Sequence, residues 1–341
     1  MNAPVSVAVV GAGHLGTFHA RALARLRPGQ PAWVIDVLAD RAAGLAAEIG
    51  ARAGTDLRAA LEQVGAVIVA TPTVSHFAVA GAALAAGCHV LVEKPITVTL
   101  EEAEALVRRA AEMRRTLQVG HVERFNPIWR ALQAEIGVPA FIEAERLAPF
   151  VPRSLDVDVV LDLMIHDLDL VLSLVPADPV AVDAVGVAVL SGREDIASAR
   201  VRFANGTVAD LTASRVSPEK VRKIRCFGPR GYHSIDLLAR SARRVRMEPA
   251  VDGTLEVPGR GRFAVREERV ERPGPDPLAE EIQTFLMAAE TGAAPGVSGA
   301  EALRVLRLAY EVREQVNRSL RQLEASGLGP VAPGPAGSGE G

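Results

Sequence analysis

Apolar positions in the first 120 residues form short continuous runs rather than alternating singly with polar positions. Each run is rich in Val, Ile or Ala and is followed by a stretch with helical spacing, such as Ser75–Ala86 or Leu100–Arg114. Thr99 and Glu102 have the spacing of a capping box at the start of the second helix. Continuous apolar strands alternating with helices predict a doubly wound α/β fold with a parallel sheet. The predicted strands are Val5–Val10, Trp33–Val37, Ala66–Ala70, His89–Val92 and Leu117–Val119.

The pattern changes after about residue 138. One helical segment, Val160–Leu174, precedes closely spaced strands, and Asn205-Gly206 predicts a hairpin with a two-residue turn of positive φ. Helical patterns return at Leu278–Glu290 and Gly299–Leu323, and nine of the last sixteen residues are Gly or Pro, which is typical of a flexible tail. We therefore expect a doubly wound domain over 1–120, a mainly antiparallel α/β domain over 121–325 and a tail over 326–341.

Charge and composition narrow the classes of protein. The 341 residues include 38 Lys and Arg against 41 Asp and Glu, with no basic cluster, which argues against a nucleic-acid-binding surface. No apolar run reaches the roughly 18 residues that span a bilayer, and the N-terminus lacks the basic region of a signal peptide, so we expect a cytoplasmic protein. Cys88 and Cys226 are expected to be buried thiols.

A glycine-rich turn follows the first predicted strand and begins a helix. Glycines allow backbone to approach a pyrophosphate, the helix N-terminus supplies N–H groups, and an acid at the end of the next strand accepts from a ribose hydroxyl. Because that acid repels a 2′-phosphate, NAD is favoured over NADP, although Arg41 could oppose this preference. The alternative is a turn that serves packing alone. The predicted cofactor-binding residues of this region are Gly11, Gly13, His14, Leu15, Gly16 and Asp36.

Two more turns follow the predicted strands Ala66–Ala70 and His89–Val92. They contain Thr71-Pro72-Thr73 and Glu93-Lys94-Pro95, and ligands of doubly wound sheets bind beyond the carboxyl ends of the strands. A partly desolvated Lys94 can polarise a substrate oxygen. A surface lysine paired with Glu93 is the equally supported alternative. The predicted cofactor contacts here are Thr71, Pro72, His76, Glu93 and Lys94.

Asp162 and His166 are four residues apart on a predicted apolar helix and therefore share a face. Ionisable groups on such a helix are costly unless partnered or used, and His can take a proton near neutral pH. A helix-cap network with a satisfied His is the alternative. A metal site of Asp162, His166 and Asp169 is disfavoured because no Cys/His ligand spacing supports it, and we predict no metal.

Together, GAGHLG, TPTVSH at 71–76, AGCHVLVEKP at 86–95 and DLMIH at 162–166 resemble the glucose-fructose oxidoreductase, inositol dehydrogenase and MocA family. The resemblance covers nearly the whole chain apart from its tail. It implies a Rossmann domain followed by an α/β domain with an open, mostly antiparallel sheet that often mediates homodimers or homotetramers. It also implies that Lys94 and His166 are catalytic and that Asp162 orients the substrate.

Three further segments are similar to the branch of this family that oxidises UDP-N-acetylglucosamine at C3. They are VGHVERFNP at 119–127, PFVPR at 149–153 and DVVLDLMIH at 158–166. This likeness implies a role in lipid A biosynthesis and functional coupling to an aminotransferase. A diphosphate needs cationic partners, and Arg146 is one candidate. The predicted substrate-binding residues are His121, Arg124 and Arg153.

Two alternatives remain at this point. One is an NAD-dependent dehydrogenase for inositol or a free sugar. The other is a non-catalytic dinucleotide-sensing regulator, since fold alone does not fix function. Such a regulator would not require Lys94 together with Asp162 and His166, so these residues favour an enzyme.

Overall fold

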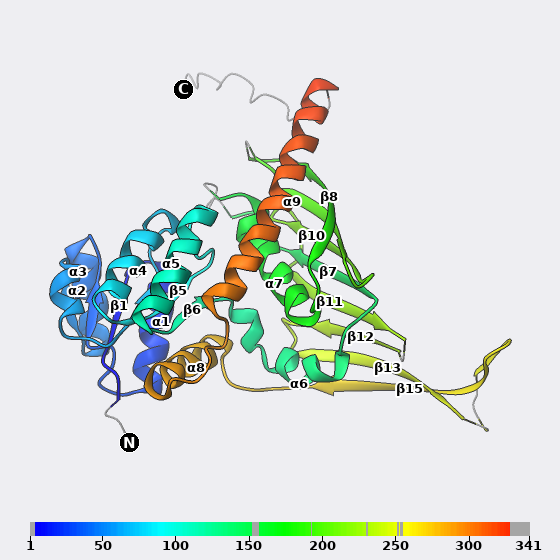
Figure 1. Ribbon diagram of the computed structural model, residues 1–341, viewed down its shortest axis with the longest axis horizontal. Coiled ribbons are helices and arrows are strands. Elements are labelled where there is room, and N and C mark those ends of the chain that lie inside the picture. The colour runs from blue at the N-terminus through cyan, green and yellow to red at the C-terminus, as the bar shows by residue number, and fades with distance from the viewer. Residues whose placement is uncertain are drawn as a thin grey trace, which may run out of the picture. The chain divides into compact units, whose positions relative to one another are not determined.

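The computed structural model describes residues 4–151, 157–191, 193–229, 231–250, 252 and 255–327. This part of the chain divides into two compact units (Figure 1). The first unit comprises Met1–Gly137, Ala239–Ala242 and Val270–Arg307, and the second comprises Val138–Leu238, Arg243–Arg269 and Leu308–Gly341. Each unit is thus assembled from three stretches of sequence, whereas one boundary near residue 120 was expected from the sequence.

The first unit contains a parallel sheet, which in the described residues has the strand order β3-β2-β1-β4-β5-β6. Its central strands β1 and β4 are buried along their whole length, as their continuous apolar sequences predicted. Strand β3 was not predicted, since its three residues carry only one apolar side chain. The strands are β1 (Val7–Val10), β2 (Trp33–Ile35), β3 (Arg52–Gly54), β4 (Ala66–Val69), β5 (His89–Glu93) and β6 (Leu117–Gly120).

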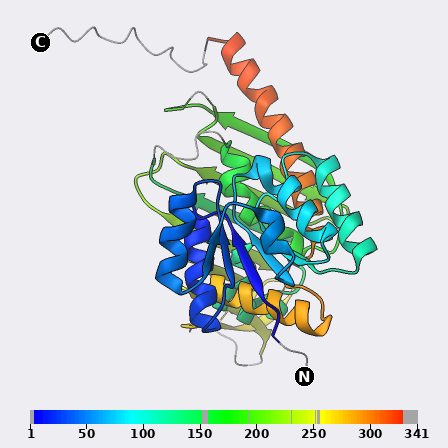
Figure 2. The ribbon, with the colours of Figure 1, turned by 90° about the vertical axis from the view of Figure 1, so that its left-hand side faces the viewer.

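Helices lie on either side of these strands (Figure 2). The Thr99 hydroxyl accepts from the N–H of Glu102, and the Glu102 carboxylate accepts from the N–H of Thr99, so the predicted capping box is confirmed. Side chains of α1, α2 and α8 pack with β1, β2, β4 and β5 in one apolar core. The helices are α1 (His14–Leu26), α2 (Ala39–Ile49), α3 (Leu57–Leu61), α4 (His76–Ala85), α5 (Leu100–Met113), α6 (Pro127–Ile136) and α8 (Pro277–Thr291), with 3₁₀ turns at Thr73–Ser75 and Val122–Phe125.

The second unit contains a larger sheet, with the order β14-β15-β13-β12-β11-β7-β10-β9-β8 among the residues that are described. The pairing of β7 with β10 is parallel, and β7 with β11, β9 with β10 and β8 with β9 are antiparallel. The mostly antiparallel sheet expected for this half is therefore confirmed. The strands are β7 (Phe141–Leu147), β8 (Pro179–Val187), β9 (Ile196–Phe203), β10 (Val208–Ser214), β11 (Val221–Gly228), β12 (Gly231–Asp236), β13 (Ser241–Pro249), β14 (Leu255–Val257) and β15 (Gly261–Glu271).

The predicted hairpin joins β9 to β10, but its turn differs from the expected one. Gly206 has a φ of 88°, whereas Asn205 does not have a positive φ. The N–H of Gly206 donates to Phe203 O, and the N–H of Phe203 donates to Thr207 O. The connection is a three-residue turn that ends in one left-handed glycine, in place of a two-residue turn with two left-handed residues.

The predicted helical segment in this half begins as a π-helix, Val160–Met164 (η3), and continues as α7 (Ile165–Leu174). The chain ends its described part in α9 (Gly299–Ala325), close to the predicted bounds. Most of the predicted tail, 328–341, lies outside the described residues. None of the described helices has the length and apolarity needed to cross a membrane.

Candidate functional site

The glycine-rich turn joins β1 to α1 and closely approaches Ala70, which follows the neighbouring strand β4. Gly11 has a φ of 99°, and a Cβ at this position would lie 2.5 Å from the carbonyl oxygen of Ala70. A Cβ at Gly16 would lie 1.7 Å from the carbonyl oxygen of Gly11. At Gly13 a Cβ would meet no described atom within 4 Å. Gly11 and Gly16 are therefore required for packing, whereas a side chain at Gly13 would enter open space.

The N-terminus of α1 is suited to bind an anion. Gly13 is the N-cap, the first turn contains no acidic residue, and no side chain in the described part of the chain caps it. His14 and Leu15, at the first positions of the helix, are exposed. Uncapped N–H groups carry the positive end of the helix dipole, so a pyrophosphate fits here without displacing a protein group.

Asp36 follows β2 and helps to shape the same turn. Its Oδ2 accepts from the N–H of Ala12 at 2.7 Å, and its Oδ1 accepts from the N–H of Leu38 at 2.9 Å. An ionised carboxylate has about four acceptor positions, so both oxygens keep capacity for ribose hydroxyls. The half-buried Asp36 is thus fixed by backbone on both sides, whereas Arg41 is exposed on α2.

His76 begins α4, and its buried ring lies between two turns. Nδ1 is 2.9 Å from the carbonyl oxygen of Pro95, and Nε2 is 2.9 Å from the carbonyl oxygen of Thr71. Burial lowers the pKa of His76, although the carbonyl contacts oppose this shift. His76 is 1% exposed and contacts the turn at Thr71 from inside. Thr71 is half-buried and Pro72 is exposed.

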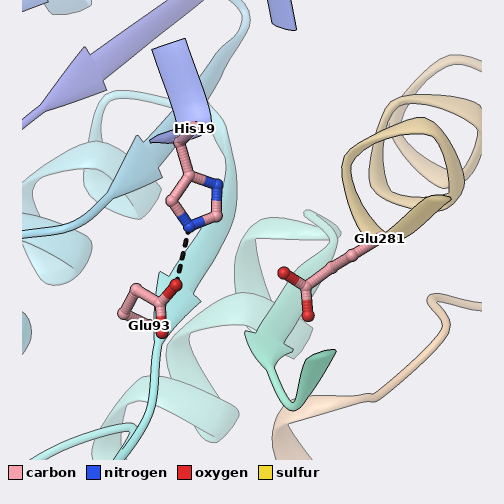
Figure 3. Close-up of side chains that lie close together, drawn as sticks. All are labelled: His19, Glu93 and Glu281. Carbon is pink, nitrogen blue, oxygen red and sulfur yellow. Dashed lines mark hydrogen bonds and ion pairs between the residues drawn. The ribbon is translucent and has the colours of Figure 1, made fainter. Parts of the chain in front are cut away.

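Glu93 ends β5, and its carboxylate is held on both sides (Figure 3). Oε1 lies 2.6 Å from Nε2 of His19, and Oε2 accepts from the N–H of Lys94 at 3.1 Å. Burial alone would raise the pKa of Glu93, but the hydrogen bond and charge of His19, with the charge of Lys94, hold that pKa below its ordinary value. Glu93 is therefore an anion committed to protein contacts, and Lys94 follows it as a half-buried side chain.

Glu281 on α8 lies beside this pair. In the described chain, His19, Glu93 and Glu281 are the group of metal-ligating residue types whose ligand atoms lie within 4.8 Å of one another. All three are buried. The 2.6 Å between His19 and Glu93 is a direct hydrogen bond rather than the spacing of two ligands on one ion. This cluster shares no residue with the metal site that the sequence disfavoured, which comprised Asp162, His166 and Asp169.

Two predicted substrate-binding residues belong to the first unit. His121 follows β6 and is buried, with 1% of its surface exposed. Arg124 lies in the next 3₁₀ turn, where its Nη1 is 3.4 Å from Oε1 of Glu301 on α9. Arg124 is thus partly neutralised by a protein carboxylate.

Asp162 and His166 lie in the second unit, on the π-helix and on the first turn of α7. Both are half-buried, as is Leu163 between them, whereas Met164 and Ile165 are buried. The N–H of Asp162 donates to Asp158 O at 2.9 Å. A π-helical turn is rare and is frequently found at functional sites.

One fully buried ion pair and one partly exposed ion pair support this helix. Arg146 on β7 donates to both carboxylate oxygens of Asp167, at 2.9 Å and 2.7 Å, and both side chains are 3% exposed. Asp158 accepts from the N–H of Leu161 at 2.8 Å and pairs with Arg313 of α9 at 3.0 Å. Arg146, considered from sequence as a diphosphate contact, therefore connects β7 to α7 instead.

Arg153, the remaining predicted substrate-binding residue, lies outside the described residues. The structure brings the glycine-rich turn, Asp36, the Thr71 turn and Lys94 to the carboxyl edge of one sheet. It places Asp162 and His166 together in the other unit.

Two exposed residues at this edge were missed by the sequence analysis. Val37 is 90% exposed and Val74 is 79% exposed, directly after Asp36 and in the turn after β4. Exposed apolar side chains beside a polar site suit the flat face of a nucleobase. Val37 was instead assigned to the strand Trp33–Val37, because an apolar residue that ends an apolar run gives no sign of being exposed.

The chain is similar to known proteins over most of its length. Residues 5–121 match the family described as an oxidoreductase family with an NAD-binding Rossmann fold, and residues 130–234 match the GFO/IDH/MocA C-terminal domain. UDP-N-acetylglucosamine 3-dehydrogenase of Acidithiobacillus ferrooxidans is 45% identical over 316 residues, which is 92% of this chain and 98% of that protein.

A crystal structure of that dehydrogenase superposes with a TM-score of 0.85 at 43% identity, over 93% of this chain and 99% of the other. The NAD-dependent scyllo-inositol 2-dehydrogenase of Bacillus subtilis is 33% identical over 64% of this chain and 69% of its own. The family matches cover both the glycine-rich turn and the segment with Asp162 and His166. The chain therefore belongs to the GFO/IDH/MocA family of NAD-binding oxidoreductases.

Proposed function

We propose that this protein oxidises the C3 hydroxyl of UDP-N-acetylglucosamine to the 3-keto sugar with NAD. The observation that carries the proposal is the 45% identity to the Acidithiobacillus ferrooxidans enzyme, which extends over 92% of this chain. The inositol dehydrogenase relatives share less, with 33% identity over 64% of the chain in the Bacillus subtilis protein.

Residues at the carboxyl edge of the first sheet would hold NAD. The N–H groups at Gly13 and the start of α1 bind its pyrophosphate, Asp36 accepts from the adenosine ribose, and Val37 and Val74 contact adenine. Gly11, Gly16, Thr71 and Pro72 shape the turns around it. NAD supplies the hydride acceptor of the reaction.

Three residues act on the substrate in this proposal. His166 removes the hydroxyl proton on its imidazole as the C–H bond of the same carbon breaks. Asp162 accepts a hydrogen bond from the substrate hydroxyl and orients it, and Lys94 stabilises the negative charge that develops on oxygen. His121, Arg124 and Arg153 are assigned to substrate binding, with the arginines toward the diphosphate.

The product chemistry suggests the neighbouring reaction. A 3-keto sugar nucleotide is a substrate for an aminotransferase, whose 3-amino product is of the kind used in lipid A biosynthesis. A cytoplasmic location and a homodimeric or homotetrameric assembly, both expected from the sequence, remain predictions.

An inositol or free-sugar dehydrogenase is the second candidate, supported by the relatives named above. A dinucleotide-sensing regulator is less well supported, because a sensor does not require Lys94 together with Asp162 and His166.

A coupled reaction tests the proposal. Oxidation of a secondary alcohol by NAD is unfavourable near neutral pH, so the ketone must be consumed as it forms. The protein is incubated with UDP-N-acetylglucosamine, NAD, a cognate aminotransferase and its amino donor, and the amino-sugar nucleotide is measured by mass spectrometry. Parallel reactions use UDP-N-acetylglucosaminuronate, myo-inositol or glucose. Turnover of one of these with none of UDP-N-acetylglucosamine would overturn the substrate assignment and leave the family assignment intact.

A further inference from the structure

The buried cluster of His19, Glu93 and Glu281 is not explained by binding of cofactor or substrate, because none of the three is exposed. Its members come from three elements of the first unit: α1, β5 and α8. Figure 3 shows the Glu281 carboxylate directed toward the His19–Glu93 pair. Burying two carboxylates beside one imidazole is costly, so the cluster is expected to have a role.

Strand β6 contacts the residues of two cluster members, Glu281 and Glu93. Gln118 of β6 donates from Nε2 to the carbonyl oxygen of Glu281 at 3.0 Å. The Oε1 atom of Gln118 accepts from the N–H of Gly296. A Cβ at Gly120 would lie 3.0 Å from Oε2 of Glu93, so the backbone of β6 lies directly under that carboxylate. The position of Glu93 is therefore determined by the strand beneath it and the helices beside it.

The Glu93 carboxylate passes this constraint on to Lys94. Its Oε1 contacts His19 and its Oε2 accepts from the N–H of Lys94, so a shift of the carboxylate moves the backbone from which the lysine side chain begins. We infer that His19 and Glu281 are positioning residues for Lys94, acting through Glu93 to fix the turn after β5. The inference rests on the proposed function for the importance of Lys94 to turnover, but the contacts themselves are independent of the substrate.

Three substitutions test the inference at different elements. His19→Gln and Glu281→Gln change one partner each without removing its bulk, and Gly120→Ala pushes on the Glu93 carboxylate while all three ionisable groups remain. Glu290→Gln is the matched control: it lies on the same helix as Glu281 and removes an ion pair between α8 and Arg27 after α1, away from Glu93.

The first measurement is kinetic. A displacement near 1 Å at a reacting group costs up to about 100-fold in rate, so each test variant should lose about 10- to 100-fold in kcat. KM and the affinity for NAD should change far less, and Glu290→Gln should retain the wild-type kcat. A general loss of stability would lower the active fraction of every variant. The control Glu290→Gln would then lose kcat together with the three test variants.

The second measurement needs no substrate. The chain has three lysines, and Lys220 and Lys223 are exposed and serve as internal references for Lys94. Acetylation with acetic anhydride, followed by peptide mass spectrometry, gives the rate at Lys94 relative to the references. This ratio should rise in the three test variants, whose turn is less constrained, and should be unchanged in Glu290→Gln.

The two measurements separate the inference from the proposed function. Unchanged Lys94 acetylation in the folded test variants, or an equal change in the control, would overturn the positioning role whatever the substrate is. Absence of turnover in the wild-type protein with every substrate would overturn the proposed function, and the acetylation ratios would still decide the inference. Because the variants alter α1, α8 and β6 separately, a folding failure in one leaves the others decisive.

Discussion

The backbone N–H groups of Lys94 and Asp162 each donate to a residue close in sequence. The N–H of Lys94 is bound by Glu93, and the N–H of Asp162 is bound by the carbonyl oxygen of Asp158. Both contacts are local in sequence, so the motifs that contain Lys94 and Asp162 also contain their partners Glu93 and Asp158. The motifs did not indicate neighbours that are distant in sequence, such as Glu281, which lies beside Glu93.

If His166 and Lys94 have the roles proposed above, substitution of either residue should abolish most turnover. General-base catalysis contributes about 10²- to 10⁴-fold, and loss of one charge donor costs a comparable factor. We expect His166→Asn and Lys94→Met each to lower kcat on that scale in the coupled assay, with NAD affinity retained. Lys223→Met, at an exposed position of β11, is the control and should behave like the wild-type protein. Near-normal turnover in either test variant would mean that its assigned role is wrong.

Cofactor preference should depend on Asp36. Its carboxylate can accept from a 2′-hydroxyl and repels a 2′-phosphate, so the protein should bind NADH more tightly than NADPH. Asp36→Asn should narrow that difference, whereas Asp40→Asn, an exposed substitution on α2, should not. Titration by nucleotide fluorescence measures both affinities. Equal or tighter binding of NADPH by the wild-type protein would show that another group, such as Arg41, outweighs Asp36.

At the scale of elements, the sequence predicted regular structure well and irregular structure poorly. The strand and helix pattern of the first unit and the Thr99 capping box depend on residues close in sequence. The π-helix at Val160–Met164 was predicted as an ordinary helix, because its apolar periodicity does not show the extra residue in the turn. Likewise, Arg146 was considered as a ligand contact, since the sequence does not show that Asp167 lies 2.7 Å away.

Substitutions at two glycines of the glycine-rich turn should separate effects on packing from effects on NAD binding. At Gly16 a Cβ would clash with backbone at 1.7 Å, so Gly16→Ala should lower the melting temperature and NAD affinity together. At Gly13 a Cβ meets no described atom within 4 Å, so Gly13→Ala should have a melting temperature near that of the wild type. Its affinity for NAD should nevertheless be much lower than that of the wild type. Thermal melts with and without NAD measure both effects. Tight NAD binding by Gly13→Ala would contradict the pyrophosphate placement.

The Arg146–Asp167 ion pair should be a strong determinant of stability in the second unit. Removal of one partner of a buried pair leaves an uncompensated charge and costs about 3–5 kcal/mol. Arg146→Met or Asp167→Asn should therefore shift urea unfolding far more than Arg243→Met, which breaks an exposed pair with Glu267. The double variant Arg146→Met/Asp167→Leu should recover part of the loss, because it leaves neither member of the pair as an unpaired buried charge. If Arg146→Met and Asp167→Asn were as stable as the wild-type protein, the ion pair would not be a determinant of stability.

For the whole molecule, the two cysteines report separately on the two units. Cys88 precedes β5 in the first unit and Cys226 lies on β11 in the second. Both are buried; burial raises the pKa of Cys88 and raises that of Cys226 to about 12. Since the thiolate is the reactive form, both thiols should resist alkylation in the native protein near pH 8 and react only when their own unit unfolds.

NAD should therefore protect the two thiols to different extents. A ligand at 100 times its dissociation constant stabilises the state that binds it by about 2.7 kcal/mol. If the first unit holds the cofactor, NAD should move the urea midpoint for alkylation of Cys88 to higher concentration. Cys226 should follow only as far as the two units unfold together, so the difference between the two shifts measures their thermodynamic coupling. Pulse alkylation with iodoacetamide, read by peptide mass spectrometry, gives both midpoints from one sample, and Gly13→Ala serves as the control in which neither should move. A shift of Cys226 without one of Cys88 would contradict cofactor binding by the first unit, because stabilisation must appear first in the unit that makes the contacts.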